Sequence, residues 1–177
     1  NPLGIDKTVP RFSWKVKSIK EGTKQKAYQV LVASDSKLLK KDQGDLWNSQ
    51  GIDSPESVLV SYKGTELLSG MIYYWKVRVR DEEGNVSPWS PVASFSVGLL
   101  NKTDWKALYI GFPTDSGYRE CPQLKKTFEV KQKNEKLLLH VNSLGYHEVY
   151  VNGKKVGDGV LAPAVSQFDK RSWVLTY

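Results

Sequence analysis

Apolar and polar residues alternate with a period of two along much of the first hundred residues. The clearest run is residues 72–80, IYYWKVRVR. Alternation over this length predicts a β-strand with one face on a core and the other in water. The positions expected to face the core are Tyr73, Trp75, Val77 and Val79, and those expected to face water are Tyr74, Lys76, Arg78 and Arg80.

Several shorter runs have the same character and are bounded by Gly, Pro, Asn, Asp or Ser. They cover residues 11–16 (RFSWKV), 27–33 (AYQVLVA), 57–62 (SVLVSY) and 91–97 (PVASFSV). DEEGN at residues 81–85 predicts a turn, and SKLLKK at residues 36–41 is long enough only for a single helical turn. About six short strands in the first hundred residues predict an all-β sandwich.

A second set of strand-like segments follows a predicted junction at residues 98–102. An Asn152-Gly153 pair between two β-prone runs predicts a hairpin, because both turn residues must adopt positive φ. We therefore expect two all-β domains, residues 1–98 and residues 99–177. The strands expected in the second domain include residues 107–112, 123–130, 137–141 and 172–177.

Composition narrows the class of protein. The chain has 177 residues, of which 40% are hydrophobic, enough for a packed core. No run reaches the roughly 20 apolar residues of a membrane span, and no signal peptide is visible at the NPLGIDKT start. The net charge of +7 is spread over both halves as lysine pairs without a nucleic-acid-binding motif, so we expect solvated lysines and no nucleic-acid partner.

The residues that could carry chemistry are few. Cys121 is the only cysteine, so no internal disulfide can form, and no supporting signature marks it as a nucleophile. Asp81-Glu82-Glu83 lies in the predicted turn and is interpreted as a solvated turn. His140 and His147 could approach one another on adjacent strands, but they lack a Cys or acidic third ligand for zinc.

Glycines near the hairpin also have an ordinary explanation. Gly153, Gly157 and Gly159 lead into no helix that could meet a phosphate, so turn and bulge positions are expected. We therefore expect no catalytic, cofactor-binding or metal-binding residue in this chain, and no cofactor.

Aromatic side chains are the candidates for contact with a sugar. Four tryptophans lack a clear inward position, namely Trp47, Trp89, Trp105 and Trp173. Packing is the favoured role for them, with Trp89 stacked against the cationic side chains of residues 72–80. The candidates for carbohydrate contact are Tyr146 and Trp173.

The first domain resembles a fibronectin type III module. Leu67 is followed six residues later by Tyr73, and then come Gly84 and the segment SPWS at residues 87–90. Such a Tyr at a sandwich corner hydrogen-bonds to the backbone just upstream. Trp14 is expected to fill the core from the opposite sheet.

The whole chain resembles the N-terminal accessory region of bacterial alpha-L-rhamnosidases. The resemblance rests on motifs in order: NPLGID (1–6), PRFSW (10–14), QKAYQVLVAS (25–34), GDLWNSQGIDS (44–54), YYWKVRVRDEEGNVSPWS (73–90), FSVGLLNKTDWKALYI (95–110) and LGYHEVYVNGKKVGDGVLAP (144–163). Asn48 stands where Asp is common, and Ala164-Val165 replaces a Gly-Trp type pair.

This resemblance implies a fibronectin-type-III-like sandwich followed by a partial jelly roll, ahead of a supporting β-domain and an alpha/alpha barrel. Parent enzymes remove terminal L-rhamnose with inversion, using an acid and a base that belong to the barrel. The resemblance therefore implies a non-catalytic fragment of a secreted or periplasmic glycoside hydrolase. It would orient the barrel and could bind a rhamnose-bearing glycan.

Two other interpretations stay open at this point: a free-standing carbohydrate-binding module and a protein-binding fibronectin-like module. A jelly roll needs about eight strands, and only five or six strand-like segments follow Trp105. An incomplete second domain favours the fragment. Because an unfinished sandwich exposes a strand edge and apolar surface, we expect the fragment to self-associate.

Overall fold

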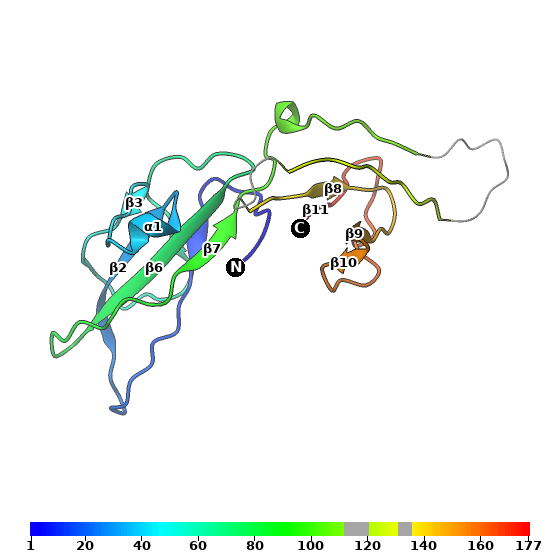
Figure 1. Cartoon of the computed structure of the whole chain (residues 1–177). Coiled ribbons are helices and arrows are strands. Elements are labelled where there is room, and N and C mark those ends of the chain that lie inside the picture. Colours follow the sequence, from blue (N-terminus) through cyan, green and yellow to red (C-terminus); the bar gives the residue numbers. More distant parts are fainter. Residues whose placement is uncertain (112–120, 131–135) are drawn as a thin grey trace.

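The computed structural model describes residues 1–111, 121–130 and 136–177, and it is built almost entirely of strands and loops (Figure 1). The strands are β1 (Arg11–Phe12), β2 (Gln25–Ala33), β3 (Trp47–Asn48), β4 (Ile52–Asp53), β5 (Val60–Ser61), β6 (Ile72–Asp81), β7 (Ala93–Ser96), β8 (His140–Asn142), β9 (Val149–Val151), β10 (Lys154–Val156) and β11 (Val174–Thr176). The helices are α1 (Ser36–Leu39) and the 3-10 turn η1 (Lys102–Asp104). The all-β class is confirmed.

The first unit is a sandwich made from a larger and a smaller sheet. The larger sheet has the order β3-β2-β6-β7, and β4 also pairs with β2. The smaller sheet pairs β1 with β5. The longest ladder joins β2 to β6 in antiparallel register, with Tyr28 opposite Val79 and Val32 opposite Trp75. This ladder places the side chains of even-numbered β2 residues beside those of odd-numbered β6 residues.

The core lies on that shared face. Phe12 from the smaller sheet is buried there, with its ring centroid 4.7 Å from that of Trp75 and 5.8 Å from that of Phe95. The buried residues of this cluster are Phe12, Tyr28, Val30, Val32, Trp47, Val60, Tyr62, Leu67, Tyr73, Val77, Phe95 and Val97. Trp75 and Val79 pack against them, so the inward face predicted for residues 72–80 is confirmed.

The outward face of β6 differs from the prediction. Lys76 was expected in water, yet it is only 5% exposed. The turn of α1 covers it, and its Nζ donates to the carbonyl oxygen of Leu39 at 2.5 Å and pairs with the carboxylate of Asp42. Tyr74 and Trp89 pack on the same patch. Alternation gives the face on which a side chain lies, but it does not show what covers that face.

Strands β1 and β5 are much shorter than the predicted segments 11–16 and 57–62. Strand β1 ends at Phe12, and Val16 is exposed although it was expected to share the inward face. In the 57–62 segment Val58 is exposed and Leu59 has φ +55°. The N–H of Leu59 bonds to Ser13 Oγ at 2.9 Å in place of a ladder partner, so β5 begins only at Val60.

The Leu67–Tyr73 spacing corresponds to a real tyrosine corner. The Tyr73 hydroxyl accepts the backbone N–H of Leu68 at 2.7 Å, and Leu67 is buried beside it. Burial raises the pKa of Tyr73, so the hydroxyl stays protonated. This predicted contact is confirmed.

The predicted junction is tied to the sandwich. The N–H of Leu100 bonds to Ser69 Oγ at 3.1 Å, and the Leu100 side chain packs against the core. Asp104 closes the turn by accepting the N–H of Asn101 at 2.9 Å. Hydrogen bonds, first of all from the Ser69 hydroxyl, lower the pKa of Asp104 and favour its charged form.

The described part of the second unit contains two small antiparallel pairs. Asn152 and Gly153 have φ +50° and +76°, and Val151 pairs with Lys154 across the turn, so the predicted hairpin β9–β10 is confirmed. Strand β11 pairs with β8, in register from Val174 opposite Asn142 to Thr176 opposite His140.

The strands predicted at residues 107–112 and 123–130 are not formed, and residue 112 lies outside the described residues. Residues 107–111 and 121–130 are exposed, and no backbone hydrogen bond joins them to any described residue. A strand exists only with a partner, and the described part of the chain supplies none here. No helix in the described ranges is long and apolar enough to cross a membrane.

Tyr73→Phe should lower the free energy of unfolding by about 1–3 kcal/mol, because it leaves the Leu68 N–H at the corner without its acceptor. The matched control is Tyr74→Phe on the same strand, which removes a hydroxyl for which the described part of the chain gives no hydrogen bond. Urea unfolding of both variants measures the difference. Equal losses would show that the corner hydrogen bond adds nothing.

Candidate functional site

Both histidines contact the C-terminal end of the chain, where they bond to different residues. His140 Nδ1 lies 2.9 Å from Thr176 Oγ1. His147 Nε2 lies 3.1 Å from the Tyr177 hydroxyl, and its Nδ1 lies 2.7 Å from Ser143 Oγ. Both ring nitrogens of His147 are therefore occupied by neutral hydroxyl groups. The contacts join the 143–147 loop to the end of β11.

No metal site arises from this arrangement. His140 bonds to Thr176 of β11 and His147 bonds to Tyr177 just after it, and the described residues hold no group of three His, Cys, Asp or Glu that could bind an ion. Burial lowers the pKa of both His140 and His147, since it disfavours the charged imidazolium. Neutral rings with hydroxyl partners indicate a structural role.

The carboxylate of Glu148, next to the hairpin β9–β10, has two side-chain partners. The Glu148 carboxylate accepts the Tyr150 hydroxyl at 2.8 Å and pairs with Lys155, which lies opposite Tyr150 across the hairpin. The hydrogen bond from Lys155 lowers the pKa of Glu148, and the same contact raises the pKa of Lys155. The carboxylate is held charged.

Carboxylates of the sandwich are also held in the charged form by their neighbours. Asp81 accepts both the backbone N–H and the side-chain amide of Asn85, and the side-chain bond lowers its pKa most. The hydrogen bond from Lys76 lowers the pKa of Asp42. In the described part of the chain, hydrogen bonds thus lower the pKa of the carboxyl groups of Asp42, Asp81, Asp104 and Glu148. A general acid for glycoside cleavage needs a raised pKa, so these groups are fitted to hold turns and ion pairs.

The two predicted carbohydrate contacts are both accessible rings. Tyr146 is 57% exposed and Trp173 is 46% exposed, with the Arg171 guanidinium 5.7 Å from the centroid of the Trp173 ring. Tyr146 lies in the 143–147 loop that His147 anchors, and Trp173 directly precedes β11. Sugar contact by these rings stays a prediction.

Three other tryptophans, Trp14, Trp47 and Trp89, are used for packing. Trp47 is buried in the sandwich core, and Trp14 lies at the edge of that core, where its Nε1–H donates to Gln25 at 2.9 Å. Lys76 Nζ and the Arg78 guanidinium each lie 4.6 Å from the ring centroid of Trp89, so the predicted stacking of Trp89 with cations is confirmed.

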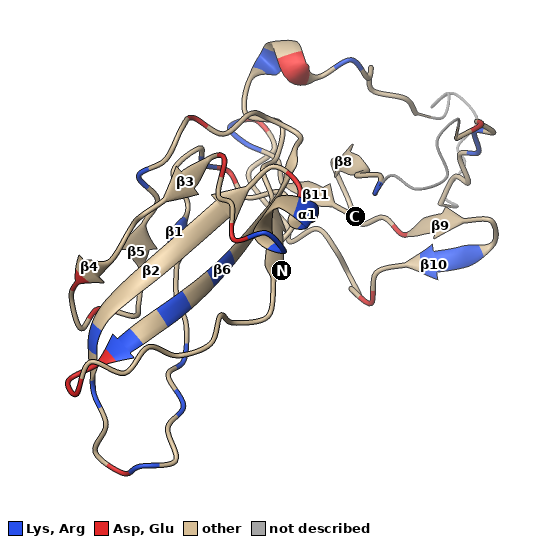
Figure 2. Ribbon diagram, turned by 60° about the vertical axis from the view of Figure 1, so that its left-hand side comes forward, with Lys and Arg blue, Asp and Glu red and all other residues tan. Residues whose placement is uncertain are grey.

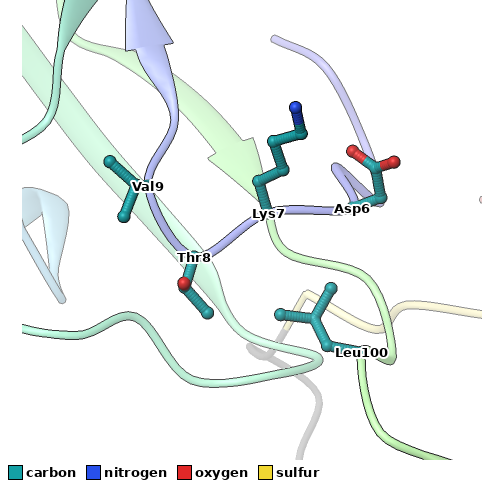
Figure 3. A pocket seen from close by; sticks show the side chains of 5 residues that line it. All are labelled: Asp6, Lys7, Thr8, Val9 and Leu100. Carbon is teal, nitrogen blue, oxygen red and sulfur yellow. The ribbon is translucent and has the colours of Figure 1, made fainter.

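Open hollows rather than clefts mark the surface of the sandwich. One of about 400 Å³ lies between the chain before β1 and the junction after β7, with Asp6 to Val9 on one side and Leu100 on the other (Figure 3). Another, of about 430 Å³, is lined by Gln25, Lys26, Pro55 and Glu82. Tyr146 and Trp173 line neither hollow, and Cys121 is an exposed free thiol away from both.

The charged residues do not form one basic face. Figure 2 shows bands of Lys and Arg on β6 and β10, with acidic residues mostly in the loops. Within the described residues the ion pairs Lys20–Glu83, Arg80–Asp53 and Lys155–Glu148 join cations to neighbouring carboxylates. The absence of a nucleic-acid partner stays a prediction.

Comparison with known proteins places this architecture in a family. Residues 1–101 match the family described as "Rha78A-like, N-terminal immunoglobulin domain", and residues 132–177 match "Alpha-L-rhamnosidase N-terminal domain". The chain belongs to the N-terminal region of the alpha-L-rhamnosidases. Immunoglobulin and fibronectin type III domains share the two-sheet sandwich, which is the architecture seen here.

Individual alpha-L-rhamnosidases agree over the full chain. One from Formosa agariphila is 36% identical over 186 residues, which cover 100% of this chain and 20% of the relative. A solved alpha-L-rhamnosidase from Dictyoglumus thermophilum has a TM-score of 0.85 at 33% identity and covers 100% of this chain and 22% of its own. A Streptomyces avermitilis alpha-L-rhamnosidase complexed with L-rhamnose has a TM-score of 0.59 at 41% identity, over 63% of this chain and 11% of its own. The chain thus spans about a fifth of the curated alpha-L-rhamnosidases that match its full length.

Two contacts were missed at the level of sequence. One is the burial of Lys76 beneath α1, for which the single-turn segment SKLLKK was the only signal. The other is the approach of Gly4, in the NPLGID motif, to Thr176 at the far end of the chain. Nothing in the local pattern of the NPLGID motif indicates its approach to Thr176.

Acidification should weaken the second unit. Because the folded state lowers the pKa of His140 and His147, the unfolded state binds more protons, and the free energy of unfolding falls as the pH drops below about 6.5. This stabilisation is present above pH 6.5 and is lost as the pH falls toward the folded pKa values. NMR titration of both rings, with the Thr176 methyl as reporter, measures it. Histidine pKa values at or above 6.5 would contradict the assignment.

Proposed function

We propose that this chain is the non-catalytic N-terminal accessory part of an alpha-L-rhamnosidase, and that it supports the parts of the enzyme that perform the reaction. The parent would remove terminal L-rhamnose with inversion, using a pair of carboxyl groups in an alpha/alpha barrel outside this chain. The observation that carries the proposal is a match over 100% of this chain to alpha-L-rhamnosidases of which it spans only about 20%. The downward-shifted carboxyls of the described residues support a non-catalytic role.

The second unit offers a surface for such support. The exposed apolar residues of its described part include Leu108, Tyr109, Ile110, Leu124, Phe128, Val130, Val160, Leu161 and Val165. Apolar surface of this extent marks a site of association, and residues 107–111 and 121–130 also carry backbone groups free of partners in the described chain. We propose that the remainder of the parent enzyme, including a supporting β-domain, covers this surface.

The division of the chain follows from the same proposal. Residues 1–98 would form the fibronectin-type-III-like sandwich, and residues 99–177 would form part of a jelly-roll domain. The ties of Leu100 and Asp104 to Ser69 would hold the start of the second part against the sandwich. We also propose that the parent is secreted or periplasmic, as expected for an enzyme that acts on glycosides outside the cell.

A weaker second role is contact with a rhamnose-bearing glycan through Tyr146 and Trp173. The exposure of both rings favours it, because an accessible ring can stack on the apolar face of a sugar. Titration of the chain with L-rhamnose, followed by Trp fluorescence of wild type and Trp173→Ala, tests this role. An unchanged wild-type signal would reject it.

The chain alone should show no rhamnosidase turnover. The assay uses a chromogenic rhamnoside over a range of pH, with a complete alpha-L-rhamnosidase as the positive control. The remainder of the parent polypeptide, expressed separately, should be less stable without residues 1–177 and should regain stability when they are added. Measurable turnover by residues 1–177 would contradict the non-catalytic role.

The isolated chain should self-associate through its second unit. Phe128→Lys and Ile110→Lys should shift sedimentation toward the monomer, since each places a charge on an exposed apolar position. Val86→Lys is the matched control, because Val86 is 56% exposed but belongs to the sandwich. A monomeric wild type at high concentration would refute the prediction, as would equal effects of all three substitutions.

A further inference from the structure

The first five residues of the chain run along the free edge of the larger sheet. Strand β7 ends the order β3-β2-β6-β7, so one side of it has no strand neighbour in the sheet. The N–H of Ser96 bonds to Pro2 O at 3.1 Å, the N–H of Ile5 bonds to Ser96 O at 2.9 Å, and Ile5 bridges to Val97 in parallel. The segment thus covers an edge that would otherwise be open to pairing with another chain.

Gly4 is held especially closely on this edge. Its N–H donates to Ser96 Oγ at 2.8 Å, and Ser96 is completely buried. Farther along the same edge, the N–H of Gly98 bonds to Ile5 O at 2.9 Å. Gly98 also lies so close that a Cβ there would be 3.2 Å from Gly4 O. The backbone of the segment is therefore fixed from the sandwich side.

The opposite side of Gly4 faces the second unit. A Cβ added to Gly4 would lie 2.2 Å from Thr176 Oγ1 and 2.8 Å from Thr176 Cβ, closer than nonbonded atoms approach. Gly4 also has φ +66°, a conformation that residues other than glycine rarely adopt. Thr176 ends β11 and bonds to His140 of β8 at 2.9 Å. Both views place the N-terminal end near β11 (Figures 1 and 2).

We infer that residues 1–5 form a strap that joins the two units and sets the position of the β8–β11 pair against the sandwich. Gly4 is the contact point, because only a residue without a side chain fits between the buried Ser96 and Thr176. A second contact supports the same arrangement, since Lys136 Nζ lies 5.4 Å from the ring centroid of Tyr74 on β6. The strap supplements the covalent junction at residues 98–102, which is tied to the sandwich but does not contact β11 in the described hydrogen bonds.

Glycine substitutions with a matched control test the strap in the whole chain. Gly4→Ala should speed amide hydrogen exchange about tenfold at Leu139 and Tyr177, which bond to each other beside Thr176. The control is Gly22→Ala, because Gly22 has φ +78° and nothing within 4 Å of an added Cβ. It imposes the same backbone strain without a clash. Faster exchange in Gly4→Ala than in Gly22→Ala, confined to β8, β11 and the adjoining Leu139 and Tyr177, supports the strap, and equal exchange in the two variants overturns it.

A cross-link tests the contact without depending on how Gly4→Ala folds. In a Cys121→Ser background, the pair Gly4→Cys and Thr176→Cys should form a disulfide under mild oxidation, after a small outward shift to the 3.5–4.5 Å that its Cβ atoms require. Non-reducing electrophoresis detects the closed loop as faster migration. The control pair, Gly22→Cys with Thr176→Cys, should stay reduced. A Gly4–Thr176 pair that stays reduced, or a control pair that links equally well, overturns the inference.

Discussion

The antiparallel ladder between β2 and β6 is the interaction on which the rest of the structure depends. Its register fixes which side chains of β2 and β6 lie on each face of the larger sheet, and so what the neighbouring segments pack against. On one face Val30, Val32 and Val77 form the core against the smaller sheet. On the other face Leu31 and Ala33 form a second apolar cluster with Leu39 of α1. Because side chains alternate strictly along a strand, the register of this one ladder decides both clusters at once.

The second face shows how a charge can be buried at low cost. Removing an ammonium group from water is expensive unless it is paired and hydrogen-bonded. Lys76 meets the requirement with the carbonyl of Leu39, the carboxylate of Asp42 and the ring of Trp89. Asp42 reaches it from a left-handed backbone position, φ +56°, just after α1 ends. The ion pair thereby fixes the short α1 turn on the sheet, which four helical residues could not achieve by their own stability.

Sequence pattern predicted the parts of the fold that depend on local chemistry. Asn152-Gly153 specifies its turn by backbone conformation alone, and the Leu67–Tyr73 corner depends on six residues of separation. The burial of Lys76 and the contact of Gly4 with Thr176 depend on residues 37 and 172 positions away, which no local period records. The carbohydrate candidates Tyr146 and Trp173 came from residue type, and their exposure was not predictable from any alternation around them.

The strand-like segments at 107–112 and 123–130 show that a strand also depends on a distant partner. Their apolar content is that of buried strands, yet their described residues are exposed and have no backbone partner in the described chain. Propensity selects the residues of a strand, but pairing creates it. Among the described residues, the buried members of the apolar core all lie between Phe12 and Val97. The sandwich therefore draws its stability from its own core. The second unit is instead positioned by its contacts with the sandwich, and among these Gly4 lies so close to Thr176 that any side chain at Gly4 would clash.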